Sequence, residues 1–168
     1  TASRSPHFVT DLRVILPTLR NTDGLRQPHH TLEKTMNRIV HIALKVDDLE
    51  KTSAFYENVF GFWEAETRKT RDHLSRHLTD GEIDFTLMKY DEGTDSAESK
   101  ASGAGPCIHH FAVEVEDLEK STKEILSYGC TIISDPGVIP VKFRAPGGTV
   151  AELVPIGRYK KPARPAGK

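Results

Sequence analysis

The sequence has few cysteines, almost no net charge and no long apolar run. Its two cysteines, Cys107 and Cys130, provide no disulfide framework, no C-x-x-C motif and no thiolate metal site. A formal net charge of −1 gives no reason to expect nucleic acid or a membrane as a partner. No apolar run approaches the ~20 residues of a transmembrane helix. These absences favour an ordinary globular protein with free, buried thiols in a reducing cytoplasm.

What the sequence does contain is an internal repeat. The stretch IVHIALKVDDLEK at 39–51 aligns without a gap with IHHFAVEVEDLEK at 108–120. This alignment pairs His41 with His110 and places His109 opposite an apolar residue. Because successive side chains of a strand point to opposite faces, we expect only His110 of the two adjacent histidines to share a site with His41.

The repeat continues towards the end of each copy. The stretch HLTDGEIDFTLM at 77–88 aligns with FRAPGGTVAELV at 143–154, again without a gap but at a slightly smaller offset. A repeat of this kind indicates two similar structural units. We therefore predict two modules, residues 38–90 and residues 106–155, which share one core in a chain with 37% hydrophobic residues.

Each module is predicted to contain a strand, a helix and three further strands. The first strand ends at an acidic pair, and Asp47 with Glu50 fits a helix N-cap with its reciprocal partner. Apolar residues at helical spacing follow, until Gly61 in one module and Gly129 in the other. Three short strand candidates come next, with Asp-Gly or Pro-Gly-Gly before the last of each set. The pattern predicts an α+β fold of two βαβββ modules.

Three segments lie outside the repeat. Residues 92–105 are small and polar, which is typical of a flexible linker. Residues 157–168 form a basic tail that we expect to be solvated and loosely ordered. Residues 1–35 have no counterpart in either module, and the charges around their apolar stretch LRVILPTL argue against a secretory signal. This N-terminal extension is either dispensable to the domain of residues 36–156 or docks on the core or on a partner subunit.

Three repeat positions carry side chains that bind metals. His41 and His110 lie on the first strands of the two modules, and Glu152 lies on the last strand of the second. Two imidazoles and a carboxylate suit a divalent first-row metal and leave coordination positions open for a substrate. The fourth equivalent position is Thr86, whose hydroxyl is a poor ligand. Repeat symmetry brings equivalent residues face to face, so we expect these side chains to converge.

Cations on the third strands are candidates for substrate contacts. Arg76 and His77 align with Lys142 and Phe143, so that both modules place a cation at one position. Such cations could bind a carboxylate or phosphate, or could simply protect strand edges. We predict that Arg76, His77 and Lys142 bind the substrate.

Three stretches in repeat register resemble the vicinal oxygen chelate superfamily, which includes glyoxalase I, methylmalonyl-CoA epimerase, fosfomycin-resistance proteins and extradiol dioxygenases. They are HIALKVDDLEKTSAFYENVFGF, IHHFAVEVEDLEK and FRAPGGTVAELVP, and the resemblance covers residues 38–156. It implies a glyoxalase-like fold in which a mixed sheet curves around one metal cleft. It also implies that His41, His110 and Glu152 bind one divalent ion, which is Zn, Ni, Co, Mn or Fe(II).

The sequence departs from this family pattern at Thr86. Glyoxalase I has a glutamate there and the epimerase a carboxamide or an acid, so the usual proton shuttle is absent. Asp84 lies two positions away on the same strand face and could replace it as a base, or could be a solvated residue near a turn. We predict Glu152 and Asp84 as catalytic residues, with Thr86 in contact with the substrate.

The resemblance implies a glyoxalase-like lyase or isomerase that holds a small substrate through adjacent oxygens. The alternatives are an iron(II) extradiol dioxygenase, a fosfomycin-type transferase and a non-catalytic sequestering protein of the bleomycin-binding kind. We expect a homodimer, and the sequence leaves open whether the modules pair within one chain or swap between two.

Overall fold

The computed structural model describes residues 37–159 and 161–166. They belong to one compact unit, Lys34–Lys168. The predicted N-terminal extension, including LRVILPTL, lies outside the described residues. Within the described part of the chain, no helix is long and apolar enough to span a membrane.

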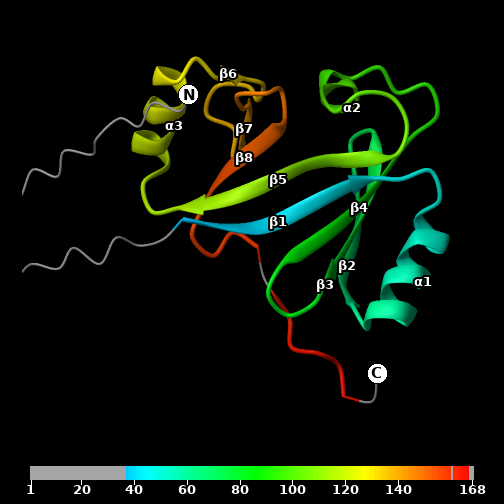
Figure 1. The fold of residues 1–168 in the computed structure, drawn as a ribbon. Coiled ribbons are helices and arrows are strands. Elements are labelled where there is room, and N and C mark those ends of the chain that lie inside the picture. Colours follow the sequence, from blue (N-terminus) through cyan, green and yellow to red (C-terminus); the bar gives the residue numbers. More distant parts are fainter. Residues whose placement is uncertain (1–36, 160, 167–168) are drawn as a thin grey trace, which may run out of the picture. The chain divides into compact units, whose positions relative to one another are not determined.

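The two predicted modules are confirmed, each with a strand, a helix and three strands (Figure 1). The elements of the first module are β1 (Arg38–Lys45), α1 (Leu49–Phe60), β2 (Trp63–Thr70), β3 (His73–Thr79) and β4 (Asp84–Tyr90). Those of the second are β5 (Cys107–Val115), α3 (Leu118–Ser127), β6 (Thr131–Ile132), β7 (Val141–Arg144) and β8 (Val150–Pro155).

The N-cap residue of the first helix lies one position later than predicted. The N-cap of α1 is Asp48, whose carboxylate accepts a hydrogen bond from the backbone N–H of Lys51 at 2.9 Å. The predicted cap, Asp47, does not serve this purpose, and Glu50 instead pairs with an arginine of β3. Gly61 ends α1 as expected, with a left-handed φ of 71°.

All eight strands form one mixed sheet in the order β2-β3-β4-β1-β5-β8-β7-β6. β1 and β5 pair antiparallel at its centre, and each pairs in parallel with the last strand of its own module, β4 or β8. The two modules therefore pair within one chain. This symmetric order explains why residues at equivalent repeat positions lie close together across the β1–β5 pair (Figure 1).

The helices and the sheet enclose two small cores. Beneath α1, Leu78 and Leu87 are fully buried with Val46 and Leu49. Beneath α3, the corresponding cluster is Val115, Phe143, Ala151 and Leu153. Strand residues alternate between faces, so the neighbours of these apolar side chains point to the other side of the sheet and are free to line a cavity.

Each central strand contains a β-bulge at the same repeat position. The ladder between β1 and β5 skips Val40 in β1 and His109 in β5, which are equivalent in the repeat alignment. A bulge inserts an unpaired residue and changes the direction of nearby side chains. Because of the bulge in β5, the strict alternation of side chains that was expected to separate His109 from His110 does not hold there.

The segment predicted to be a flexible linker contains a short helix, α2 (Ala97–Ala101). Ser99 in this helix is buried, and the Lys45 ammonium donates hydrogen bonds to the carbonyls of Ser99 (3.1 Å) and Gly103 (2.9 Å). These bonds tie α2 to the end of β1. The prediction of flexibility for residues 92–105 is therefore replaced by a packed connection between the modules.

The beginning of the basic tail also packs on the domain. The indole N–H of Trp63 donates to the carbonyl of Pro162 at 3.1 Å, and the guanidinium of Arg164 lies 5.9 Å from the centre of the Trp63 ring. Tyr159 contacts the buried cluster at the centre of the sheet. The described part of residues 157–168 thus contacts the domain through Tyr159, Pro162 and Arg164. Cys107 and Cys130 are free and half-buried rather than buried.

Candidate metal centre

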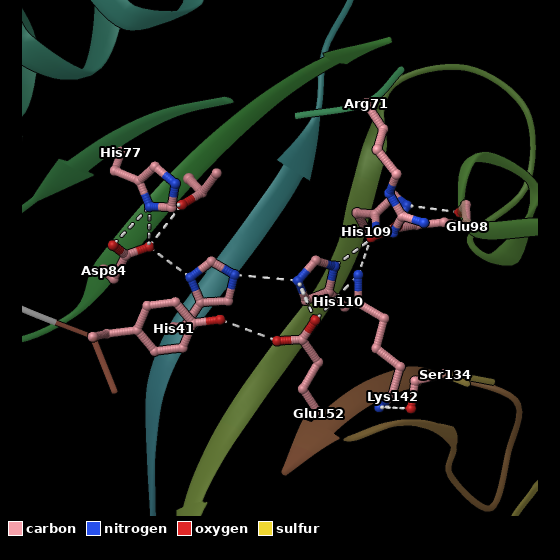
Figure 2. A network of polar contacts seen from close by, with 12 residues as sticks. His41, Arg71, His77, Asp84, Glu98, His109, His110, Ser134, Lys142 and Glu152 are labelled. Carbon is pink, nitrogen blue, oxygen red and sulfur yellow. Dashed lines mark hydrogen bonds and ion pairs between the residues drawn. The ribbon is translucent and has the colours of Figure 1, made fainter. Parts of the chain in front are cut away.

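The three predicted metal ligands converge on the cavity face of the sheet (Figure 2). His41 of β1, His110 of β5 and Glu152 of β8 are all buried, and their ligand atoms lie within 4.8 Å of one another. The Nε2 atoms of His41 and His110 are 3.2 Å apart, and His110 Nε2 is 3.2 Å from Glu152 Oε1. The repeat alignment predicted this set correctly as neighbours, since β1, β5 and β8 are adjacent strands.

The spacing and chemistry of these atoms fit a divalent ion. Two ligand atoms that each lie about 2.0–2.2 Å from one ion at near-tetrahedral or octahedral angles are roughly 3 Å apart. His41 Nδ1 lies 2.6 Å from the Asp84 carboxylate, which fixes the proton on Nδ1 and leaves the Nε2 lone pair facing the other ligands. A buried cluster of two lone-pair nitrogens and a carboxylate is stabilised by a cation between them.

Asp84 is the centre of a hydrogen-bond network on the first module. Its carboxylate accepts from His41 Nδ1 (2.6 Å), from His77 Nδ1 (2.9 Å) and from the Thr86 hydroxyl (2.7 Å). Burial raises the pKa of Asp84, but the hydrogen bonds from His41 and His77 outweigh this and hold the pKa far below its usual value. Asp84 lies on the predicted face, yet its oxygens are occupied by donors, so its geometry suits orientation of histidines better than proton abstraction.

His77 has one occupied and one unoccupied ring nitrogen. Its side chain is buried on β3 and lines the cavity, with Nδ1 directed at Asp84 and at the Thr86 hydroxyl (2.8 Å). Nε2 of His77 has no hydrogen-bond partner among the described residues. A buried polar atom without a partner is unusual and requires an explanation.

Arg76 and Lys142, which the alignment matched, lie on different faces of the sheet. The repeat alignment is therefore one residue out of register on the third strand of each module. In the ladders, His77 pairs with Thr86 and Lys142 pairs with Glu152. The structural counterpart of Lys142 is therefore His77, and the predicted match between Arg76 and Lys142 is wrong. Arg76 points towards α1, where its guanidinium donates to the Glu50 carboxylate at 2.8 and 2.7 Å. The structure does not bring Arg76 to the cavity.

Lys142 does line the cavity, but its ammonium is held by two carboxylates. Nζ lies 3.2 Å from Glu152 Oε1 and also forms an ion pair with Glu98 of α2 (Figure 2). Burial raises the pKa of Glu98, and the ammonium of Lys142 outweighs this and lowers it. Sequence reasoning missed Glu98, because nothing in a polar connecting segment indicates a long-range ion pair.

The bulge in β5 brings His109 into the site as well. Its Nδ1 lies 2.6 Å from Nδ1 of His110, and its Nε2 lies 3.1 Å from both the Glu98 carbonyl and the Tyr90 hydroxyl. Burial lowers the pKa of His109 to about 4 and that of His110 well below its usual value, so both rings are neutral at pH 7. The expectation that His109 points away from His110 is thus wrong.

Neutral rings allow one proton arrangement in which His110 can bind a metal through Nε2. His110 Nδ1–H donates to His109 Nδ1, and His109 Nε2–H donates to the carbonyl of Glu98. These two hydrogen bonds link His110 to the backbone of α2 and thereby fix its tautomer. Asp84 does the same for His41, so each candidate histidine ligand has its own supporting group.

Tyr159 completes the site from outside the repeat. Its ring stacks on His41 with centroids 4.3 Å apart and planes 5° apart, and its hydroxyl donates to Glu152 Oε2 at 3.1 Å. Burial and the nearby Glu152 carboxylate raise the pKa of Tyr159, so the hydroxyl remains a donor. The hydrogen bond from Tyr159 to Oε2 leaves Oε1 of Glu152 directed at His110. The position of Tyr159 in a basic tail carried no signal that sequence reasoning could use.

A cavity of about 1160 Å³ opens beside these groups. It receives side chains from both modules and from α2, including all three candidate ligands. A cavity of this size accommodates a small molecule next to the ligand set.

Comparisons with known proteins agree with this arrangement. The sequence matches the Glyoxalase family, described as the Glyoxalase/Bleomycin resistance protein/Dioxygenase superfamily, over residues 38–151. It is 25% identical over 146 residues to a lactoylglutathione lyase of Arabidopsis thaliana, with 77% of this chain and 48% of that protein covered. It is 30% identical over 134 residues to the mitochondrial methylmalonyl-CoA epimerase of Bos taurus, with 70% and 74% covered. The chain thus spans about half the length of the plant protein.

A solved structure shows the same fold. The methylmalonyl-CoA epimerase from Mycobacterium tuberculosis superposes with a TM-score of 0.55 at 20% sequence identity, covering 70% of this chain and 86% of that one. At this level of identity, the likeness concerns the arrangement of strands and helices.

Proposed function

Because the chain belongs to the Glyoxalase/Bleomycin resistance protein/Dioxygenase superfamily, we propose that it is a divalent-metal-dependent lyase or isomerase. Its substrate would be a small molecule bound through adjacent oxygens. The observation that carries the proposal is the convergence of His41, His110 and Glu152 as buried ligand atoms at the wall of a cavity. A three-residue set leaves coordination positions for substrate oxygens.

In this proposal, His41 and His110 hold the ion through Nε2 and Glu152 through Oε1. The bound ion would act as a Lewis acid that polarises substrate oxygens and makes an adjacent C–H bond more acidic. Asp84 orients the His41 ring, His109 orients the His110 ring, and Tyr159 restrains the Glu152 carboxylate. Fixed ligand orientation contributes to affinity and to the position of the substrate.

The named relatives support a reaction of this class, since one is a lyase and the other an epimerase. Thr86 sets this chain apart from a symmetric site, because it stands where the second module has Glu152 and offers no carboxylate. The proposed reaction therefore needs a base other than the residue at position 86.

An iron(II) dioxygenase is a second candidate. Two histidines and one carboxylate with open positions are also the ligand set of non-haem iron(II) oxygenases. The chain offers this set from adjacent strands, so iron chemistry has the same structural support as zinc or nickel.

Metal titration followed by activity assays tests the proposal. Chelator-treated protein is titrated with Zn²⁺, Ni²⁺, Co²⁺, Mn²⁺ and Fe²⁺ by calorimetry, with Glu152→Ala as the control that loses one ligand. The loaded forms are then assayed with the hemithioacetal of methylglyoxal and glutathione, with methylmalonyl-CoA, and with a catechol under oxygen. Turnover of an acidic-carbon substrate supports the lyase or isomerase, and oxygen uptake with iron alone supports the dioxygenase. Absence of binding by every metal would contradict both and favour a sequestering protein.

A further inference from the structure

Building on the function proposed above, we infer that His77 is the general base of this enzyme, oriented by Asp84. His77 lies on β3, at the structural counterpart of Lys142, and pairs with Thr86 in the β3–β4 ladder. It therefore stands beside the position at which a carboxylate is missing. The base is supplied from the neighbouring strand of the same module.

The hydrogen bonds of His77 fix its tautomer. Nδ1 lies 2.9 Å from Asp84 Oδ2 and 3.1 Å from Oδ1. A carboxylate accepts hydrogen bonds, so Nδ1 carries the proton and Nε2 carries a lone pair. The Thr86 hydroxyl donates to Asp84 at 2.7 Å, which leaves its own lone pairs towards His77 Nδ1. An acid that orients the imidazole of a base in this way is a recurring catalytic arrangement.

The free nitrogen is a buried atom of a side chain that lines the cavity. His77 is only 4% exposed and lines the same cavity as the ligand set, and its Nε2 has no partner among the described residues. Burial of an unsatisfied nitrogen costs free energy unless a ligand satisfies it. The ring centres of His77 and His41 are 6.4 Å apart, and His77 is not part of the ligand cluster. The Asp84 carboxylate accepts a hydrogen bond from Nδ1 of each of these two rings.

The proposed step is a proton transfer without net oxidation. His77 Nε2 takes a proton from the carbon next to a carbonyl, and the electron pair of the C–H bond moves onto the carbonyl oxygen to give an enolate. The protonated His77, stabilised by the Asp84 carboxylate, returns the proton to the former carbonyl carbon in an isomerisation, while the hydroxyl proton of the first carbon moves to the former carbonyl oxygen and leaves a carbonyl at the first carbon. Atoms and electrons balance without a further reactant.

Solvent exchange at the substrate carbon tests this role separately from metal binding. The protein is loaded with Ni²⁺ or Zn²⁺, and deuterium incorporation from D₂O into the hemithioacetal and into methylmalonyl-CoA is measured by mass spectrometry. We expect His77→Gln to slow exchange by about 10²–10⁴-fold, the usual contribution of a general base. Its metal affinity by calorimetry should match that of the wild type, because His77 is not a ligand.

His73→Gln is the matched control. His73 is buried on the same strand, lines the same cavity and is likewise paired with an aspartate, through Nδ1 at 3.0 Å from Asp72. We expect it to retain exchange. His77→Ala should recover part of its exchange rate on addition of imidazole, which a residue with a merely structural role would not do.

Nitrogen-15 NMR of the histidine rings provides a measurement that needs no substrate. The signals that disappear in His77→Gln should show a protonated Nδ1 and an unprotonated Nε2. A protonated Nε2 would overturn the inference, as would equal exchange rates in the wild type and His77→Gln. If the wild-type protein binds metal but exchanges neither substrate, the proposed lyase or isomerase fails and the role of His77 fails with it.

Discussion

The two modules have the same order of elements and equivalent bulges in their first strands, but they carry different side chains at the cavity. At the first-strand position both provide a histidine, His41 and His110, whose Nε2 atoms are 3.2 Å apart. At the last-strand position the second module has Glu152 and the first has Thr86. At the third-strand position the second has Lys142 and the first has His77.

This comparison shows which side chains each module contributes to the cavity. The second module contributes two of the three candidate ligands and balances the charge of Glu152 with Lys142. The first contributes one ligand and an Asp84 network whose outer histidine has a free nitrogen. Symmetry of the backbone brings all these groups to one cavity, and under the proposed function the loss of symmetry in the side chains would separate metal binding from proton transfer.

The largest expected effect is the loss of a ligand from either module. His41→Ala, His110→Ala and Glu152→Ala should each weaken Ni²⁺ binding by orders of magnitude, because each removes a coordination bond from a three-residue site. Calorimetry on chelator-treated variants measures this, and circular dichroism checks folding. Thr86→Ala is the control and should bind metal as the wild type does. Normal binding by any of the first three variants would remove that residue from the site.

A smaller effect should follow from making the two bulges alike. His109→Val gives β5 the residue that β1 has at its bulge, Val40, and removes the acceptor of His110 Nδ1–H. Loss of a group that orients a metal ligand typically costs about 10–100-fold in affinity. We therefore expect Ni²⁺ affinity to fall within that range, less than in His110→Ala. Unchanged affinity would restore the view from strand alternation, in which His109 is no part of the site.

Thr86→Glu should make the last strands alike. The new carboxylate would stand at the counterpart of Glu152 and offer a fourth ligand, so metal affinity should rise by about tenfold, or 1.4 kcal/mol. Repulsion from the Asp84 carboxylate, 2.7 Å from the present hydroxyl, limits the gain. Calorimetry with Ni²⁺ measures it, with Thr86→Gln as the uncharged control. A decrease in affinity would mean that the side chain at position 86 does not reach the ion.

The modules and the proximity of the three candidate ligands could be predicted because they depend on local pattern and on spacing. The two ungapped repeat alignments placed His41, His110 and Glu152 at repeat positions on three strands. These strands are adjacent in the sheet, which brings the three side chains together. The bulge at His109 could not be predicted, since an unpaired residue leaves no mark in hydrophobic alternation. Because of this bulge, His109 contacts His110 instead of pointing away from it.

Other errors came from loop length and from distance along the chain. The span from His77 to its partner Thr86 is one residue shorter than the span from Lys142 to Glu152, so an ungapped alignment placed Arg76 in the wrong register. Glu98 and Tyr159 were missed because they belong to segments outside the repeat. Their partners, Lys142 and Glu152, lie on other elements, and only the folded chain brings them together.

The smallest effect should come from the cation that faces away from the cavity. Arg76→Met removes a bidentate ion pair with Glu50 of α1, and because the Glu50 side chain is 78% exposed, solvent screens this pair. We expect no change in Ni²⁺ affinity or in deuterium exchange, and a small decrease in melting temperature. Lys142→Met is the comparison, because its ammonium lies 3.2 Å from the Glu152 oxygen that would bind the ion. Removal of this like charge should raise metal affinity severalfold. If Arg76→Met instead altered exchange while Lys142→Met left affinity unchanged, the register that pairs His77 with Lys142 would be refuted, and with it the division of chemistry between the modules.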